Sequence, residues 1–375
     1  MDKFIPVNTP LLDGNEKKYV EECVETGWIS SEGEFVKRFE ESMAHFVDRK
    51  YGISVTNATA GLEVAVAALG LKAGDEVIMP TFTIVSCIIP LVNRGIVPVL
   101  IDSDEKTFNM KVDEIESKIT PKTRAIMVVH IYGLTVEMDK VLELAKKYNL
   151  KIIEDAAEVH GQTYKGKKCG SFGDISVFSF YANKIIATGE GGMIVTDSEE
   201  LATKCKSIRN LCFKPERRFV HDELGFNYRM TNTQAAIGLA QLEKIDEHIE
   251  KKHFIGRKYT ELLKDVDSIN LPIAKTDYCE NIYWVYAITL KKDYKMNAIQ
   301  VMDKLKEEGI GTRPFFYPMH KQPVFNNKGM FVNEKYEGAE YISEKGFYVP
   351  SGIGITEEEM EIVADKVKKV LKMGE

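Results

Sequence analysis

The sequence predicts a two-domain α/β protein whose larger part holds a mostly parallel β-sheet, and three observations support this prediction. The chain has 375 residues, too many for one compact core. From about residue 50, short β-branched runs alternate with helical stretches, as in sheets of buried parallel strands. After residue 240 the pattern changes to long charged helices, which indicates a smaller α+β domain. We place the domains at residues 1–245 and 246–375.

Seven short apolar runs are the expected strands of the larger domain. Their length and β-branched content are typical of buried strands. In chain order they are residues 51–55, 76–80, 97–102, 124–133, 150–156, 174–180 and 192–197. Helical stretches at 58–70 and 136–149 separate several of them, which favours a largely parallel, seven-stranded sheet.

The smaller domain is expected to combine charged helices with strand-like runs. Helices are predicted at 241–264, 298–309 and 357–372, and a strand at 282–290. In open α/β sheets, ligands gather at the carboxyl ends of the strands. We therefore look for chemistry where the seven strands of the larger domain end.

Composition and charge argue against several classes of protein. The net charge of −7, without a basic block, speaks against nucleic acid as the main partner. No apolar run is long enough to span a membrane, and residues 1–18 lack a signal peptide's apolar stretch, so we expect a cytoplasmic protein. Six cysteines without CxxC spacing are expected to be reduced, mostly buried thiols. Seven scattered histidines without HExxH predict no metal site.

Polar residues follow several of the predicted strands. In TNAT, Asn57 can cap a helix whose free amides would bind an anion such as phosphate; a cap without a ligand is the alternative. Ser179 offers a hydroxyl from another strand end. Asp155 ends an apolar run, so its carboxylate should be half buried and should need a partner. That partner could be a protonated pyridine nitrogen or an ordinary lysine.

Lys184 lies between an aromatic-rich strand and the glycine cluster TGEGG. The spacing of these glycines does not fit G-x-G-x-x-G, and the GK[ST] of a P-loop is missing. Pyridoxal 5′-phosphate would explain all these features, because it needs a lysine for a Schiff base, an acid at its ring nitrogen, and amides and hydroxyls at its phosphate. The residues that would supply them are Lys184, Asp155, Ala58, Thr59 and Ser179.

Long motifs are spread over nearly the whole chain. They are GWISSEG, SVTNATAGLEVA, GDEVIMPTFT, HIYG, IEDAAEVHG, GSFGDISVFSFYANKIIATGEGGM, LGFNYRMTNTQAAIGLAQL and GTRPFFYPMH. Together they resemble the DegT/DnrJ/EryC1/StrS family of pyridoxal-phosphate sugar aminotransferases, and within it the branch of GDP-perosamine synthases. The resemblance implies a fold type I aminotransferase and a homodimer with active sites at the subunit interface. It also implies transfer from L-glutamate to a nucleotide-linked 4-keto-6-deoxyhexose, giving GDP-perosamine for glycan or O-antigen biosynthesis.

The resemblance implies a role for each residue that matches the family's motifs. Lys184 would carry the cofactor and move the proton, and Asp155 would hold the ring nitrogen. Glu158 stands where many relatives have glutamine, near the cofactor's phenolic oxygen. The phosphate would be bound by Ala58, Thr59 and Ser179, with Asn227 reaching in from the other subunit. The sugar nucleotide would be bound by Trp28, Ser31, Arg313, Tyr317 and His320; a structural turn or interface residue is the alternative for each of these five.

One position departs from the family's pattern. Relatives often carry Tyr or Trp two residues after the position of Phe82, where the side chain covers the ring face. Here that residue is Ile84. Either Ile84 covers the ring through apolar contact, or Phe82 or another aromatic residue does so.

Three other functions are compatible with parts of the sequence. An aminotransferase of this kind could act on a UDP- or dTDP-linked keto sugar, at C4 or at C3. A pyridoxal-phosphate sugar dehydratase is a second alternative, but such relatives replace the lysine with histidine, so Lys184 counts against it. A non-catalytic, cofactor-binding regulator would add a DNA-binding segment or lose the lysine, and the sequence shows neither.

Overall fold

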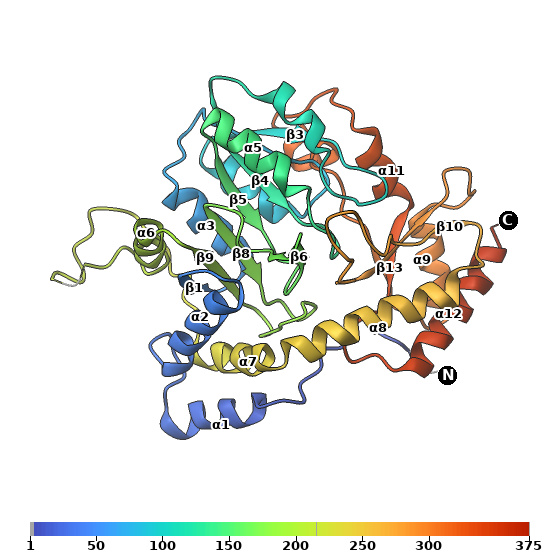
Figure 1. The fold of residues 1–375 in the computed structure, drawn as a ribbon, viewed down its shortest axis with the longest axis horizontal. Helices are drawn as coiled ribbons and strands as arrows, with labels where there is room; N and C mark the ends of the chain where they lie inside the picture. The colour runs from blue at the N-terminus through green and yellow to red at the C-terminus, as the bar shows by residue number, and fades with distance from the viewer. Residues whose placement is uncertain (1–3, 215, 375) are drawn as a thin grey trace.

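The structure, a computed structural model, describes residues 4–214 and 216–374. It has a large part built on a seven-stranded sheet and a smaller part built on a four-stranded sheet (Figure 1). The predicted α/β fold with a smaller α+β part is therefore confirmed. All six cysteines are buried and free, as expected. Among the described helices, none combines the length and the apolar character needed to cross a membrane.

The large sheet has the strand order β1-β9-β8-β5-β4-β2-β3. Its members lie at the seven predicted runs: β1 Tyr51–Val55, β2 Glu76–Pro80, β3 Val97–Ile101, β4 Thr123–Val129, β5 Lys151–Asp155, β8 Ile175–Ser179 and β9 Gly192–Thr196. Strands β3, β2, β4, β5 and β8 pair in parallel, and β9 is antiparallel to β8 and β1. The predicted run 124–133 ends as a strand at Val129, because the chain turns at Tyr132 (φ 54°) and Gly133 (φ 99°).

Side chains alternate between the two faces of this sheet and fill two cores. On β4, Ala125, Met127 and Val129 belong to one core, while Ile126 and Val128 belong to the other. The helices of the large part are α1 Glu16–Thr26, α2 Glu34–Phe46, α3 Ala58–Ala68, α4 Ile89–Asn93, α5 Met138–Tyr148, α6 Glu199–Arg209 and α7 Asn232–Glu243. The first core contains side chains of α2, α3, α6 and α7, and the second contains side chains of α5.

The smaller part holds an antiparallel sheet with the order β10-β11-β13-β12. Its strands are β10 Ile269–Asn270, β11 Tyr286–Leu290, β12 Arg313–Pro314 and β13 Gly346–Val349. Its helices are α8 Ile245–Leu263, α9 Ala298–Glu307, α10 Pro323–Asn326, α11 Glu337–Lys345 and α12 Glu357–Lys372. A two-stranded ribbon, β6 Thr163–Tyr164 and β7 Lys167–Lys168, and 3₁₀ turns at Val85–Cys87, Val112–Glu114, Glu116–Lys118 and Met319–Lys321 complete the elements.

Two further predicted elements differ from the structure. The run 241–264 is not one helix, because the backbone leaves the helical conformation at Lys244 (φ −110°, ψ 14°) and divides α7 from α8. The run 282–290 is a strand only from Tyr286, because Tyr283 has a positive φ of 51° and turns the chain before it. That turn brings the next residue, Trp284, toward the large part of the molecule.

Helix α8 connects the two parts along the lower side of the molecule as seen in Figure 1. Its first residue, Ile245, packs in the core of the large part, while Ile255, Tyr259 and Leu263 pack in a core of the smaller part. The division between residues 245 and 246 stays a prediction. Ile5 packs in the core of the smaller part, so the chain enters and leaves that part more than once.

Candidate active site

A cavity of about 680 Å³ lies where β4, β5 and β8 end. Its wall includes six of the seven residues expected to bind the cofactor: Ala58, Thr59, Asp155, Glu158, Ser179 and Lys184. They come from three segments, the start of α3 and the ends of β5 and β8, which the fold brings to one edge of the sheet. The cavity is therefore the candidate active site.

Asp155 is the last residue of β5, and only 3% of it is exposed. Its Oδ1 accepts a hydrogen bond from the Ala157 N–H at 3.0 Å, and its Oδ2 accepts one from the Cys87 thiol at 3.2 Å. Burial raises the pKa of Asp155, and these two donors and the charge of Lys184 only partly oppose it. A buried carboxylate of this kind is stabilised by a positive charge placed against it.

Lys184 follows β8 and points its amine at the carboxylates. Its Nζ lies 3.5 Å from Glu158 Oε1 and 3.6 Å from the centre of the Trp284 ring. Burial lowers the pKa of Lys184, although the charges of Glu158 and Asp155 oppose this. A lowered pKa leaves more of the amine unprotonated near neutral pH, and the unprotonated amine is the nucleophile.

Glu158 completes the charged group of the cavity. Burial raises its pKa to about 7, against the opposing effects of Lys184 and of the Tyr132 N–H, which donates to Oε2 at 2.9 Å. In a fraction of the molecules the Glu158 carboxyl is therefore protonated at neutral pH. A protonated carboxyl can donate a hydrogen bond, which a carboxylate cannot.

The first turn of α3 forms another wall of the cavity. Asn57 caps this helix by accepting a hydrogen bond from the Ala60 N–H at 2.9 Å, so the expected cap is present. Thr59 donates from its hydroxyl to Ser86 at 2.8 Å. Gly192 packs directly against this turn, since an added Cβ would lie 2.8 Å from the carbonyl carbon of Asn57. Ser179, at the end of β8, adds a second hydroxyl. Together these groups suit an anion such as phosphate.

The other predicted binding residues lie outside the cavity wall. Trp28 and Tyr317 are 58% and 53% exposed, and Arg313 is exposed on β12. Ser31 is partly exposed before α2, and Asn227 is exposed after the loop that follows α6. His320 is buried, where its Nδ1 lies 2.8 Å from the Thr81 hydroxyl and its Nε2 lies 3.0 Å from Glu340.

The position that departs from the family's pattern lies in the cavity wall. Ile84 is 44% exposed and lines the cavity, whereas Phe82 is fully buried and packs against Tyr132, Phe315 and Phe316. Phe82 therefore does not face the cavity in the described structure. Ile84 and the aromatic residues of the wall are left as the candidates for covering a ring.

Several wall residues were not predicted from the sequence as part of the site. Trp284, Phe316 and Tyr348 follow residue 245 in the chain and line the cavity, and the Trp284 ring lies against the Lys184 amine. The indole of Trp284 also donates to the Asn183 carbonyl at 2.9 Å, beside Lys184. These contacts depend on how the two parts pack, and no spacing within one segment predicts that.

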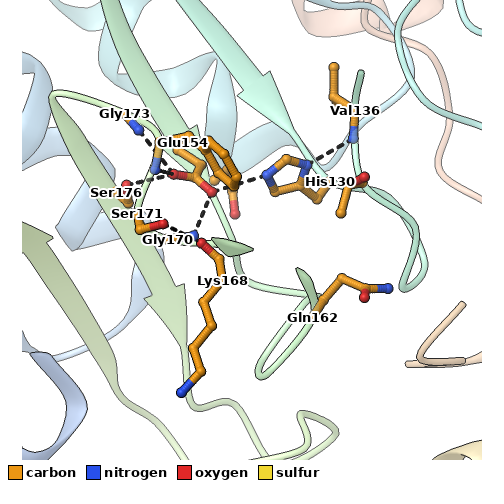
Figure 2. A network of polar contacts seen from close by, with 12 residues as sticks. His130, Val136, Glu154, Gln162, Lys168, Gly170, Ser171, Gly173 and Ser176 are labelled. Carbon is orange, nitrogen blue, oxygen red and sulfur yellow. Dashed lines mark hydrogen bonds and ion pairs between the residues drawn. The ribbon is translucent and has the colours of Figure 1, made fainter. Parts of the chain in front are cut away.

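Glu154 precedes Asp155 on β5, and its side chain therefore points to the opposite face of the sheet. Figure 2 shows the polar contacts of Glu154. The Glu154 carboxylate accepts hydrogen bonds from the N–H groups of Gly170, Phe172 and Gly173. It also accepts from the Ser176 hydroxyl at 2.9 Å and from His130 Nε2 at 3.1 Å. His130 Nδ1 accepts the Val136 N–H, which assigns the ring proton to Nε2.

These donors determine the charge of Glu154. Burial acts to raise its pKa, but His130 and the N–H groups of Gly170 and Gly173 outweigh burial and lower the pKa to about 2. Ligand atoms of His130, Glu154 and Cys169 lie within 4.8 Å of one another, a spacing that could suit a metal ion. Because hydrogen bonds already occupy the oxygens of Glu154 and both nitrogens of His130, this group needs no ion to be stable.

Comparisons with known proteins place the chain in one family. The model of the DegT/DnrJ/EryC1/StrS aminotransferase family matches residues 10–368. A GDP-perosamine synthase of Caulobacter vibrioides is 42% identical over 98% of both chains, and one of Escherichia coli O157:H7 is 40% identical over 98% of both. A relative of Bacillus subtilis, 34% identical over 96% of this chain and 94% of its own, is named for its dependence on pyridoxal phosphate.

A solved structure gives the same result for the fold. Helicobacter pylori PseC, an aminotransferase involved in the biosynthesis of pseudoaminic acid, superposes with a TM-score of 0.93. It is 25% identical, and the match covers 99% of this chain and 100% of that one. The fold is thus that of the sugar aminotransferases that use pyridoxal 5′-phosphate. The chain belongs to the DegT/DnrJ/EryC1/StrS aminotransferase family, as a sugar aminotransferase dependent on pyridoxal 5′-phosphate.

Proposed function

We propose that this enzyme transfers the amino group of L-glutamate to the C4 carbonyl of a GDP-linked 4-keto-6-deoxyhexose and produces GDP-perosamine. The observation that carries the proposal is the buried Lys184 amine, placed beside Asp155 and Glu158 in one cavity. Relatives named GDP-perosamine synthase at 42% and 40% identity support the choice of substrate. A product of this kind would serve glycan biosynthesis, such as that of the O-antigen of lipopolysaccharide, in the cytoplasm.

The residues of the cavity fit pyridoxal 5′-phosphate. Lys184 has an amine of lowered pKa, and Asp155 is a buried carboxylate that would be stabilised by a protonated ring nitrogen. The capped start of α3 and two hydroxyls suit the phosphate. The residues that would hold the cofactor are Lys184, Asp155, Glu158, Ala58, Thr59 and Ser179.

Each charged side chain then has a task. Bound pyridoxal phosphate supplies a carbonyl for amino transfer and an electron sink for the bond broken at the α carbon of the amino donor. Lys184 Nζ takes up and returns the proton at that carbon, for which a lowered pKa suits it. Asp155 holds a proton at the ring nitrogen. Glu158, partly protonated at neutral pH, can donate a hydrogen bond to an oxygen as the glutamine of many relatives would.

We further propose that the enzyme is a homodimer whose sites need both chains. The loop after α6 extends away from the body of the molecule (Figure 1), and Phe219 and Leu224 within it are 81% and 97% exposed. Large apolar side chains so exposed are typical of a surface that a partner covers. Asn227 follows this loop and is exposed, which would let it reach the phosphate in the partner's cavity. The exposed residues Trp28, Arg313 and Tyr317 and the partly exposed Ser31 would bind the nucleotide sugar.

Mixing two inactive variants tests the shared site. Asn227→Asp would place a negative charge against the phosphate, and Lys184→Ala would remove the amine. In a mixed dimer, one site would hold both lesions and the other neither, so activity should return to part of the parent level. Complete inactivity of a verified mixed dimer would mean that Asn227 serves its own chain's site.

The substrate is tested by incubating the enzyme with glutamate and GDP-, UDP- or dTDP-linked 4-keto sugars and following the product mass. We expect the GDP sugar to gain one amino group, and Lys184→Ala to give no product with any sugar. Faster turnover of a UDP or dTDP sugar, or amination at C3, would replace the proposed substrate with that alternative. Loss of a hydroxyl without gain of nitrogen would indicate a dehydratase. The presence of Lys184 argues against this outcome, because dehydratases of this kind have histidine at that position.

A further inference from the structure

The segment between β2 and α4 forms part of the cavity wall. Thr83, Ile84 and Ser86 line the cavity, while Cys87 ends the 3₁₀ turn Val85–Cys87 and is fully buried. The Cys87 Sγ lies 3.2 Å from Asp155 Oδ2 and 3.2 Å from the Thr83 hydroxyl. The other buried cysteines with polar contacts in the described structure are bonded elsewhere, such as Cys23 to Asn232. Cys87 is thus the thiol that meets a charged residue of the cavity.

The direction of these hydrogen bonds follows from their chemistry. A carboxylate only accepts, so the Cys87 S–H donates to Asp155 and the Thr83 O–H donates to the sulfur. Burial and the nearby charge of Asp155 raise the pKa of the Cys87 thiol well above its ordinary value, so it keeps its proton at neutral pH. Cys87 therefore remains a donor whenever Asp155 is charged.

The contact occupies one of the two oxygens of Asp155. Oδ1 is held by the Ala157 N–H, which belongs to the same turn of the chain, whereas Oδ2 is held by a residue 68 positions away in sequence. Together the two bonds restrict the rotation of the carboxylate about its last single bond. A thiol is a weak donor, so it can orient Asp155 while removing less of its basicity than a hydroxyl or an amide would.

We propose that Cys87 is a positioning residue for the cofactor ring: its thiol orients the Asp155 carboxylate toward the ring nitrogen. The proposal rests on the role of Asp155 given under the proposed function. The proposal has a specific consequence: replacing Cys87 should weaken the binding only of a ligand that has a ring nitrogen. General packing around Cys87 would affect any ligand of the same shape.

The test compares two ligands on full-length protein stripped of cofactor. One is pyridoxal 5′-phosphate, and the other is its carbocyclic analogue, in which a C–H group replaces the ring nitrogen. Dissociation constants are measured by absorbance or fluorescence titration for the parent, Cys87→Ala, Cys87→Ser and Asp155→Asn. Cys205→Ala is the matched control, because Cys205 is also fully buried but lies on α6, outside the cavity wall.

We expect Cys87→Ala to weaken pyridoxal phosphate binding by roughly three- to tenfold, the range for one lost hydrogen bond, and to leave the analogue's binding within about twofold. Cys87→Ser should restore the preference, because its hydroxyl also donates, and Cys205→Ala should change neither ligand. If Cys87→Ala does not fold, Cys87→Val fills the space without a donor and replaces it in the test.

Equal weakening of both ligands, or no weakening of either, would overturn the proposal. The measurements on Asp155→Asn distinguish a wrong role for Cys87 from a wrong role for Asp155. If Asp155→Asn discriminates between the ligands and Cys87→Ala does not, only the role of Cys87 is wrong. If neither discriminates, Asp155 does not hold the ring nitrogen, and the role assigned to it under the proposed function is wrong as well.

Discussion

Glu154 and Asp155 are neighbours on β5, and both are almost completely buried, yet the chain surrounds them differently. Glu154 accepts from His130, Ser176 and three backbone N–H groups, which outweigh burial and lower its pKa. Asp155 accepts from Ala157 and Cys87, and burial raises its pKa. The difference shows how a fold separates roles: a carboxylate whose lone pairs are saturated holds the structure together, whereas one left short of donors can bind a cation. The Glu158 carboxyl belongs to the second kind, and the Lys184 amine is the cation beside it.

We expect the largest effect from removing the Lys184 amine, which lies on the cavity side of the sheet. Lys184→Ala should lose the visible absorption of the bound cofactor and all transamination, yet stay folded, because its amine contacts the cavity rather than the core. Absorbance, product mass and circular dichroism measure the three outcomes. Lys252→Met is the matched control: this buried lysine, whose pKa burial lowers to about 7, donates to the Ser351 carbonyl, outside the active-site wall. It should keep the absorption band, and normal turnover by Lys184→Ala would refute the assignment.

On the other face of β5, Glu154→Ala should lower the stability of the fold. It leaves His130, Ser176 and several buried N–H groups without their acceptor, which should destabilise the protein by about 3–5 kcal/mol. Denaturant unfolding of the cofactor-free protein measures the loss. A destabilisation no larger than that of Asp155→Ala would remove the contrast between the two residues.

The pH dependence of stability should have opposite signs for the two kinds of carboxyl. The pKa of Glu154 is lowered to about 2 in the folded protein, so the stability it contributes is present above the unfolded value of 4.5 and is lost as the pH falls toward 2. The pKa of Glu158 is raised to about 7, so its contribution is lost as the pH rises from 4.5 through 7. Each change should be on the order of 3 kcal/mol.

Unfolding of the cofactor-free protein across this pH range measures both limbs. Glu154→Gln should flatten the acid limb, and Glu158→Gln should flatten the limb toward neutral pH. Curves of the same sign for both residues would contradict the comparison.

The smallest of these effects should be Asp155→Asn. The amide keeps the size of the side chain but cannot hold the ring nitrogen protonated, so cofactor should remain bound while turnover falls by roughly ten- to a hundredfold. Steady-state kinetics with parallel absorbance spectra measure both. A rate within about threefold of the parent would mean that Asp155 only caps the turn at Ala157.

The sequence predicted most of the large part because its signals are local. The seven strands are short β-branched runs between turns. The site residues Lys184, Asp155, Glu158 and Ala58 follow or end strands whose ends the sheet brings to one edge. What it could not predict depends on long-range packing. The aromatic wall at Trp284 comes from the smaller part, and the hydrogen bond from Cys87 to Asp155 joins segments 68 residues apart.

Two further features were not predicted from the sequence. The run 241–264 is helical in composition throughout, but the chain turns at Lys244 so that Ile245 packs in one core and Tyr259 in the other. The pairing of Glu154 with His130 was not predicted either, because each residue has an unremarkable setting in its own segment. Saturation of a buried group by distant donors becomes visible only when the fold is assembled.

Ile5 pairs with Ile310, where the Ile5 N–H donates to the Gly309 carbonyl and the Ile5 carbonyl accepts from Gly311. A ribosome synthesises Ile5 long before these partners, so the segment around Ile5 stays unpaired until residues 309–311 have emerged. The large sheet, whose strands all lie between residues 51 and 196, can form during that wait. The smaller part, which needs both Ile5 and the segment around Ile310, can be completed only after both have been synthesised, and therefore after the large sheet.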